Sequence, residues 1–253
     1  MNYILVIPAR YQSTRFPGKP LANLRGVPLI EHVWRRCCQA VDASAVVIAT
    51  DDDRIVEVAT AFGANVEMTS PECPTGTDRV AEVASRVPAE WYLNVQGDEP
   101  FVEPAAIRTV INATENAASD VAAINAMSAI SNESDFRSVT VPKPVTDSSG
   151  RLLYMSRAAI PTDKHLNFHS AFRQVGLYAF SPSALSHYSP VAMKSTLESL
   201  EDIEILRLVE AGLRVQMVKV PAAGVAVDTP EDLAKAETIF SSPTVDSAIK
   251  RTG

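Results

Sequence analysis

Apolar and polar residues alternate in blocks along the first 130 residues, and these blocks predict alternating strands and helices. Short runs rich in Val, Ile and Leu, typical of buried strands, occupy 3–7, 45–49, 65–68, 91–95 and 121–126. Between them the apolar residues recur with helical spacing near 28–40, 53–62, 77–87 and 104–117. Alternating strands and helices form βαβ units, so we expect a Rossmann-like α/β fold whose mostly parallel sheet has helices on both faces.

The pattern changes after residue 130. Residues 139–180 predict longer strands and loops, and 197–211 predict one amphipathic helix. Its apolar stripe would contain Leu197, Leu200, Ile203 and Leu208. A further strand is expected over 214–220, and Thr229 followed by Pro230 is typical of the start of a last helix.

These elements predict a single α/β domain over residues 1–240. Within it we expect residues 139–210 to form an inserted lobe on the substrate side, which would also provide a subunit contact. The polar segment 241–253 is expected to be a flexible tail.

Composition excludes several classes of protein. A chain of 253 residues can form one large α/β domain with a substantial core. No apolar run approaches the ~20 residues needed to span a bilayer, and the sequence has no secretory signal pattern, so we expect a cytoplasmic protein without a membrane span. Three cysteines without metal-binding spacing argue against a disulfide framework. A net charge of −7 argues against nucleic-acid binding.

A basic loop follows the first strand directly. The strand ends at Pro8-Ala-Arg10, and Arg15 and Lys19 follow among turn-forming residues. Cations in a Pro- and Gly-shaped loop at the carboxyl end of a parallel strand are suited to bind a polyphosphate. Each cation alone would equally suit a solvated surface loop. Three cations within ten residues favour an anion site.

Two carboxylates are candidates to ligate a metal. Asp98 follows the strand at 91–95 through Gly97, which places it at the same sheet edge as the basic loop. Asp228 precedes the last predicted helix. Mg²⁺ is commonly held by one or two carboxylates together with substrate phosphates. The alternative is that both residues are turn or helix-capping residues.

The segment Pro74-Thr-Gly-Thr-Asp-Arg79 provides a further candidate. Its backbone N–H groups could contact a base or a phosphate, and Thr77 or Arg79 could bind polar edges of a nucleotide. An ordinary helix start explains the same residues equally well.

The order of these motifs resembles the CMP-sugar-acid synthetases, and most closely those that use 3-deoxy-D-manno-octulosonate (Kdo). The resemblance is carried by the segments 8–21, 76–79 and 95–100, and then by Leu153-Tyr-Met-Ser-Arg-Ala-Ala-Ile-Pro161. It continues through Gly176-Leu-Tyr178, the acidic segment 197–207 and Val227-Asp-Thr-Pro-Glu-Asp-Leu233. The similarity therefore covers about residues 3–235 in the family's order.

The resemblance implies a Mg²⁺-dependent transfer of CMP from CTP to the anomeric hydroxyl of Kdo, with release of pyrophosphate, for lipopolysaccharide or capsule synthesis. It also implies a homodimer. The implied catalytic residues are Arg10, Lys19, Asp98 and Asp228, of which Asp98 and Asp228 would bind the metal. The implied nucleotide-binding residues are Pro8, Ala9, Arg10, Arg15, Lys19, Thr77, Arg79 and Gln96. The sugar-binding positions are Ser156, Arg157, Gln174, Tyr178 and Glu204, with Arg157 as a partner of the sugar carboxylate.

Two residues on the sugar side depart from the family pattern. Gln174 stands where the family has His, and Ile205 stands where it has Gln. Both positions are implied to face the sugar, so a modified Kdo or a sialic-acid-like nonulosonate is an alternative substrate. A catalytically silent nucleotide-binding protein is a further alternative. A dinucleotide-dependent oxidoreductase is disfavoured because no Gly-x-Gly-x-x-Gly follows the first strand.

Overall fold

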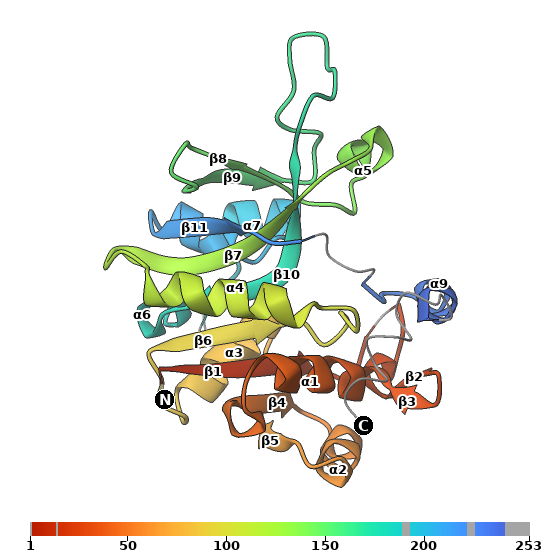
Figure 1. Cartoon of the computed structure of the whole chain (residues 1–253). Helices are drawn as coiled ribbons and strands as arrows, with labels where there is room; N and C mark the ends of the chain where they lie inside the picture. The colour runs from red at the N-terminus through yellow and green to blue at the C-terminus, as the bar shows by residue number, and fades with distance from the viewer. Residues whose placement is uncertain (1, 14, 189–192, 222–225, 241–253) are drawn as a thin grey trace.

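The computed structural model describes residues 2–13, 15–188, 193–221 and 226–240 (Figure 1). A seven-stranded sheet runs through the middle of the molecule. Only β10 is antiparallel to its neighbours, so the predicted mostly parallel sheet is confirmed. The strands, in spatial order, are β11 (Arg214–Lys219), β7 (Val121–Ala129), β10 (Phe172–Phe180), β6 (Trp91–Val95), β1 (Tyr3–Ala9), β4 (Val46–Thr50) and β5 (Asn65–Met68).

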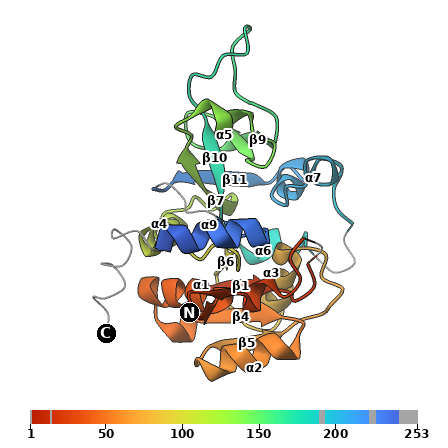
Figure 2. The ribbon, with the colours of Figure 1, turned by 90° about the vertical axis from the view of Figure 1, so that its right-hand side faces the viewer.

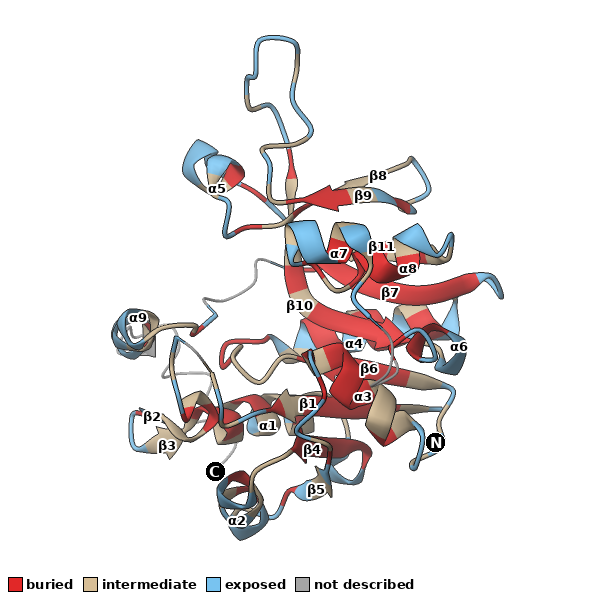
Figure 3. Ribbon diagram, turned by 180° about the vertical axis from the view of Figure 1, so that it is seen from behind, coloured by how far each residue is buried: buried red, intermediate tan, exposed pale blue. Residues whose placement is uncertain are grey.

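Both faces of the sheet are covered by helices, as the sequence predicts. Along β1, Leu5 and Ile7 pack against one face and Ile4 and Val6 against the other, because successive strand side chains point in opposite directions. The first face carries α1 (Leu29–Ala40), α2 (Asp53–Ala61) and α4 (Pro104–Glu115). The second carries α3 (Gly76–Ala84), α6 (Pro182–Leu185) and α8 (Leu206–Glu210). The sheet between them is largely buried (Figure 3).

Residues 130–171 follow β7 and form a group of elements outside the central sheet. They contain α5 (Glu133–Arg137) and a small antiparallel sheet of β8 (Lys143–Thr146) and β9 (Leu152–Ser156). The connection from β9 to β10 projects away from the rest of the molecule (Figure 1). β10 then returns into the central sheet, so the predicted lobe contributes one strand to the main domain. A second small antiparallel pair, β2 (Asn23–Leu24) and β3 (Val27–Pro28), precedes α1.

The prediction of one helix over 197–211 is wrong. The structure has α7 (Thr196–Glu201) and α8, separated at Asp202, whose φ of 51° lies in the left-handed region. A capping box formed by Ser195 and Glu198 starts α7. Leu200 is 77% exposed and does not belong to an apolar stripe. The chain turns at Asp202. As a result, Ile203 and Glu204 lie beside a cleft at the sheet edge, whereas Ile205 and Leu206 lie in the core.

The C-terminal helix α9 (Pro230–Phe240) begins where the sequence predicts it. The Thr229 hydroxyl accepts a hydrogen bond from the Asp232 backbone N–H at 3.2 Å, which is the expected N-cap contact. The tail predicted over 241–253 lies outside the described residues. Within the described part of the chain, no helix is long and apolar enough to cross a membrane.

Candidate active site

A cleft of about 430 Å³ opens at the sheet edge where β1 and β6 end. Figure 2 looks onto this edge, with α9 in front. The cleft brings together every predicted catalytic, nucleotide-binding and sugar-binding residue of the implied set except Thr77 and Ser156. Its walls include Pro8, Ala9, Arg10, Arg15, Lys19, Arg79, Gln96, Asp98, Arg157, Gln174, Tyr178, Glu204 and Asp228. Residues separated by up to 220 positions in the sequence therefore share one cavity.

Lys19 links the two predicted metal ligands. Its Nζ lies 2.8 Å from Asp98 Oδ2 and 3.2 Å from Asp228 Oδ1. Arg15 Nη2 lies 3.4 Å from the same Asp228 oxygen. Two carboxylates that converge on one cation, beside a further guanidinium, form a site where a divalent cation and a polyphosphate can be bound together.

Two glycines bring these groups together. Gly18, with φ of 71°, turns the basic loop, and a Cβ at this position would lie 3.1 Å from the Tyr11 ring. At Gly97, a Cβ would lie 2.8 Å from the Pro8 carbonyl oxygen. Because Gly97 has no side chain, the turn that carries Asp98 packs directly against the end of β1. The turn glycine that the sequence suggested is therefore also a close-packing residue.

The sequence did not identify Glu99 as a site residue. Glu99 follows Asp98 directly and contacts β10. Its Oε1 accepts a hydrogen bond from the Gly176 backbone N–H at 3.0 Å. Burial, with the adjacent Asp98 as the second cause, raises the pKa of Glu99 to about 7. The motif that contains Glu99 was visible in the sequence, but its burial depends on β10, which pairs with β6 from 80 residues further along the chain.

The start of α3 forms one wall of the cleft. Thr77 lies behind this wall, where its hydroxyl accepts from Asn94 Nδ2 at 3.3 Å and its backbone N–H donates to Glu204 Oε2 at 3.0 Å. The structure thus links Thr77 to Glu204, one of the predicted sugar-binding residues. Arg79 faces the cleft, and its guanidinium Nη2 lies 3.2 Å from Asp51 Oδ2.

The predicted sugar-side residues lie on β10 and at the turn between α7 and α8. Gln174 Nε2 donates to Asn125 Oδ1 at 3.0 Å, which fixes its amide at the cleft. Burial raises the pKa of Tyr178 well above its usual value, so its phenol stays protonated. Burial also raises the pKa of Glu204, and the hydrogen bonds from Thr77 only partly offset this effect.

The Arg157 guanidinium is held by backbone carbonyls. Its Nε donates to the Glu201 carbonyl at 2.5 Å, and its Nη1 and Nη2 each donate at 3.0 Å, to the carbonyls of Val139 and Asp202 respectively. The Glu201 side chain accepts from Ser156 Oγ at 2.6 Å and from the Arg157 backbone N–H at 2.9 Å. Although Arg157 lines the cleft, three of its hydrogen bonds already fix the loop around it.

Ile205 does not face the cleft. It is fully buried in the core that includes Leu206 and Tyr178. The implied position on the sugar is therefore wrong, because the break after α7 turns Glu204 toward the cleft and Ile205 into the core. Of the two departures from the family pattern, only Gln174 reaches the cavity.

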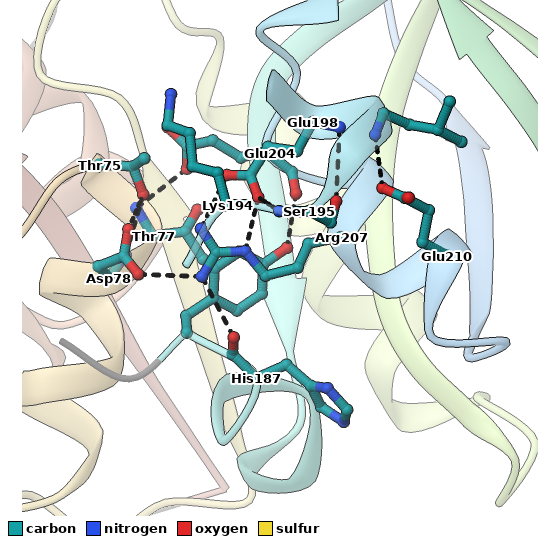
Figure 4. Close-up of polar contacts among 12 residues, drawn as sticks. Thr75, Thr77, Asp78, His187, Lys194, Ser195, Glu198, Glu204, Arg207 and Glu210 are labelled. Atoms are coloured by element: carbon teal, nitrogen blue, oxygen red, sulfur yellow. Dashed lines mark hydrogen bonds and ion pairs between the residues drawn. The ribbon is translucent and has the colours of Figure 1, made fainter. Parts of the chain in front are cut away.

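A buried cluster of charges lies behind the wall of the cleft that contains the start of α3 and Glu204 (Figure 4). Arg207 contacts both oxygens of Glu198, at 2.6 and 2.8 Å, and lies 3.2 Å from Asp78 Oδ1. Burial lowers the pKa of Arg207, but Glu198 and Asp78 together raise it above its ordinary value. Arg207 therefore joins α3, which carries the nucleotide-side loop, to α7, which precedes Glu204.

Comparison with known proteins decides the family. The cytidylyltransferase family model matches residues 4–217. This chain belongs to the cytidylyltransferase family. This cytidylyltransferase is 43% identical over 247 residues to the 3-deoxy-manno-octulosonate cytidylyltransferase of Geobacter sulfurreducens, with 93% of this chain and 98% of the relative covered. It is 36% identical to the 8-amino-3,8-dideoxy-manno-octulosonate cytidylyltransferase of Shewanella woodyi, with 92% and 96% covered.

The fold of this cytidylyltransferase also has a solved counterpart. The structure of a CMP:2-keto-3-deoxy-manno-octonic acid synthetase complexed with CTP matches it with a TM-score of 0.88 and 35% sequence identity. The match covers 95% of this chain and 99% of that one. The α/β fold and the resemblance to the CMP-sugar-acid synthetases are therefore confirmed.

Proposed function

We propose that this protein transfers CMP from CTP to the anomeric hydroxyl of Kdo, giving CMP-Kdo and pyrophosphate. The observation that carries the proposal is the single cleft in which Lys19, Asp98 and Asp228 converge beside Arg157, Gln174 and Tyr178. The names of its relatives supply the two substrates. A cation-rich nucleotide side next to a polar sugar side is the arrangement that this two-substrate reaction requires.

The chain's own cations have a defined task in this reaction. CTP and Kdo are both anions, so their approach has to be made favourable by positive charge. Arg10, Arg15 and Lys19 line the part of the cleft where the triphosphate would lie. Lys19 is paired with the two carboxylates. A bound triphosphate would compete for this ammonium group and would leave the carboxylates available to a metal.

The two carboxylates fit Mg²⁺. Asp98 and Asp228 present oxygens within 3.2 Å of one nitrogen, so a cation placed between them would contact both. Mg²⁺ is usually held by one or two carboxylates and completes its shell with phosphate oxygens and water. When bound, it would neutralise charge on the triphosphate and assist deprotonation of the attacking hydroxyl. The protein residues align the hydroxyl with the α-phosphorus and hold the departing pyrophosphate.

The sugar side supports a polyhydroxylated acid as the acceptor. Tyr178 provides a phenol, Gln174 an amide fixed by Asn125, and Glu204 a carboxyl group held by the start of α3. A modified Kdo is the second candidate acceptor, since one relative is named for the 8-amino sugar and Gln174 departs from the family pattern.

An assay of pyrophosphate release tests the proposal. Purified protein is incubated with CTP, MgCl₂ and one of three acids: Kdo, its 8-amino analogue or a nonulosonate. We expect turnover that needs both CTP and the sugar acid, with the highest kcat/KM for Kdo. A higher kcat/KM for another acid would transfer the proposal to that acid. Absence of turnover with all three would refute the enzymatic function and favour a nucleotide-binding role.

The cellular setting belongs to the same proposal. We place the enzyme in the cytoplasm, as a homodimer whose product serves lipopolysaccharide or capsule synthesis. The projecting segment between β9 and β10, on which Leu166 is 63% exposed, is the proposed subunit contact. Light scattering on the purified protein, with a Leu166→Glu variant, tests the dimer: the variant should shift toward the monomer. A wild-type protein that is monomeric at micromolar concentration would refute it.

A further inference from the structure

A second cavity adjoins the nucleotide side of the cleft. Its volume is about 250 Å³, and its lining includes Arg10, Tyr11, Asp51 and Arg79. Arg10 and Arg79 line both cavities, so the two spaces are neighbours. None of the carboxylates assigned to the metal reaches this second cavity. It is available for a part of the nucleotide other than the phosphates.

The position of the cavity suits the base. Asp98 follows β6 and Asp51 follows β4, and the two strands are separated only by β1. Neighbouring strands lie about 4.8 Å apart, so two spacings amount to about 10 Å. A nucleoside extends over a similar length from its 5′-phosphate to its base. A nucleotide whose phosphates lie at Lys19 and Asp98 can thus extend past the end of β1 to Asp51.

Asp51 and Arg79 form a fixed pair of an acceptor and a donor. Arg79 is 3% exposed, and its guanidinium is held by the Thr69 hydroxyl and by Asp51 Oδ2 at 3.2 Å. The other carboxylate oxygen of Asp51, Oδ1, is buried and has no hydrogen-bond partner among the described residues. A carboxylate has about four acceptor positions. Asp51 therefore keeps unused acceptor capacity beside a cationic donor, and a buried acceptor without a partner is costly.

We infer that Asp51 selects cytosine over uracil, with Arg79 as its partner. Cytosine presents an amino group next to the acceptor N3, and carboxylates accept hydrogen bonds from this amino group. Uracil presents a carbonyl oxygen and an N3–H at the same positions, so the carboxylate would face an acceptor and the guanidinium a donor. The Asp51–Arg79 pair matches the first pattern and opposes the second. This inference deepens the proposed function, since it rests on CTP as the nucleotide.

Tyr11, another residue that lines the cavity, is held by contacts on two sides. The Arg54 guanidinium lies 3.3 Å from the centroid of the Tyr11 ring, and Arg54 is itself held by Asp52 through bonds of 2.8 and 2.6 Å. The Tyr11 carbonyl accepts from the Gly18 N–H at 2.8 Å. Tyr11 is thus tied both to the basic loop and to the start of α2.

The test is an Asp51→Asn variant assayed with CTP and with UTP, each with Kdo. Asn keeps an oxygen for Arg79 and can offer an N–H to the carbonyl of uracil. We expect the ratio of kcat/KM for CTP to that for UTP to fall by about 10- to 100-fold, the usual effect of one good base contact. The matched control is Asp53→Asn, which makes the same charge change at an exposed residue of α2 and should leave the ratio unchanged.

Two outcomes would overturn the inference. One is an Asp51→Asn enzyme that keeps the wild-type ratio. If the variant turns over neither nucleotide, the binding of CTP and UTP is measured by calorimetry instead. The second refuting outcome is then an unchanged binding preference for CTP. A lost preference for CTP would support the role of Asp51. Failure of the proposed function is distinguishable, because it appears as absent turnover in the wild type. Calorimetry with wild type and variant still tests Asp51 in that case.

Discussion

Replacement of Arg207 by methionine should strongly destabilise the protein. Arg207 is 6% exposed on its side chain, and the carboxylates of Asp78 and Glu198 that it neutralises are 0% and 1% exposed. Without the guanidinium, two carboxylates would remain in a region with almost no access to water. Loss of one partner from a buried charge cluster costs about 3–5 kcal/mol. For a domain of this size, that corresponds to a decrease in Tm of roughly 6–20 °C.

Urea unfolding at neutral pH, followed by circular dichroism, measures this effect. Arg207→Lys should fall between wild type and Arg207→Met, because one ammonium group cannot reproduce the two-oxygen contact with Glu198 and also reach Asp78. Arg35→Met is the matched control: Arg35 is 57% exposed on its side chain and forms an i,i+4 pair with Glu31 on α1, and such helix pairs are worth about 0.3–0.5 kcal/mol. An Arg207→Met protein within 1 kcal/mol of wild type, on the order of the Arg35→Met change, would refute the reasoning.

Three further substitutions test the site. Asp98→Asn should lower Mg²⁺-dependent turnover on the order of 10²-fold or more with an unchanged circular dichroism spectrum, and near-normal turnover would exclude the metal role. Gly97→Ala would place a methyl group 2.8 Å from the Pro8 carbonyl oxygen, so we expect a loss of about 1–3 kcal/mol in urea unfolding together with reduced activity; wild-type behaviour would show that the turn is not tightly packed. Glu201→Gln should raise KM for the sugar acid about 10-fold and leave KM for CTP unchanged, because it weakens the acceptor of Ser156 and Arg157; equal changes in both values would contradict this role. Burial raises the pKa of Glu201, but its hydrogen bonds more than offset this and lower it overall, so the stability advantage of wild type over Glu201→Gln should disappear as the pH falls through the folded-state pKa.

The sequence was sufficient to predict the parallel part of the sheet and the meeting of the basic loop with Asp98. β1, β4 and β6 are short apolar runs with helices between them, and each has local signals at its ends. The basic loop and Asp98 lie directly after such strands, so their meeting at one edge follows from the fold class alone.

The arrangement of the residues proposed to bind the sugar could not be predicted in the same way. β10 enters the sheet antiparallel between β6 and β7, and no local pattern specifies this pairing. The burial of Glu99 follows from that pairing. The break at Asp202 is also invisible to helical periodicity, because Leu197, Ile203 and Leu208 fit a single stripe in the sequence. This break decides that Glu204 faces the cleft and that Ile205 does not.

The Asp51–Arg79 pair shows a further limit of sequence reasoning. Arg79 belongs to a motif that the sequence identifies, whereas Asp51 reads as an ordinary residue at a helix start. Their contact at 3.2 Å joins residues 28 positions apart, because α3 packs beside the end of β4. A site residue of this kind becomes visible only when the cavity it lines is known.

The most direct test of the central claim is observation of the bond that the enzyme is proposed to form. Protein, MgCl₂, CTP and Kdo labelled with ¹³C at the anomeric carbon are followed by ¹³C and ³¹P NMR. We expect a new anomeric signal that is split by coupling to phosphorus and that grows together with the pyrophosphate signal. An unchanged anomeric signal while pyrophosphate is released would show that CTP is cleaved without transfer to the sugar, and would exclude the proposed CMP transfer.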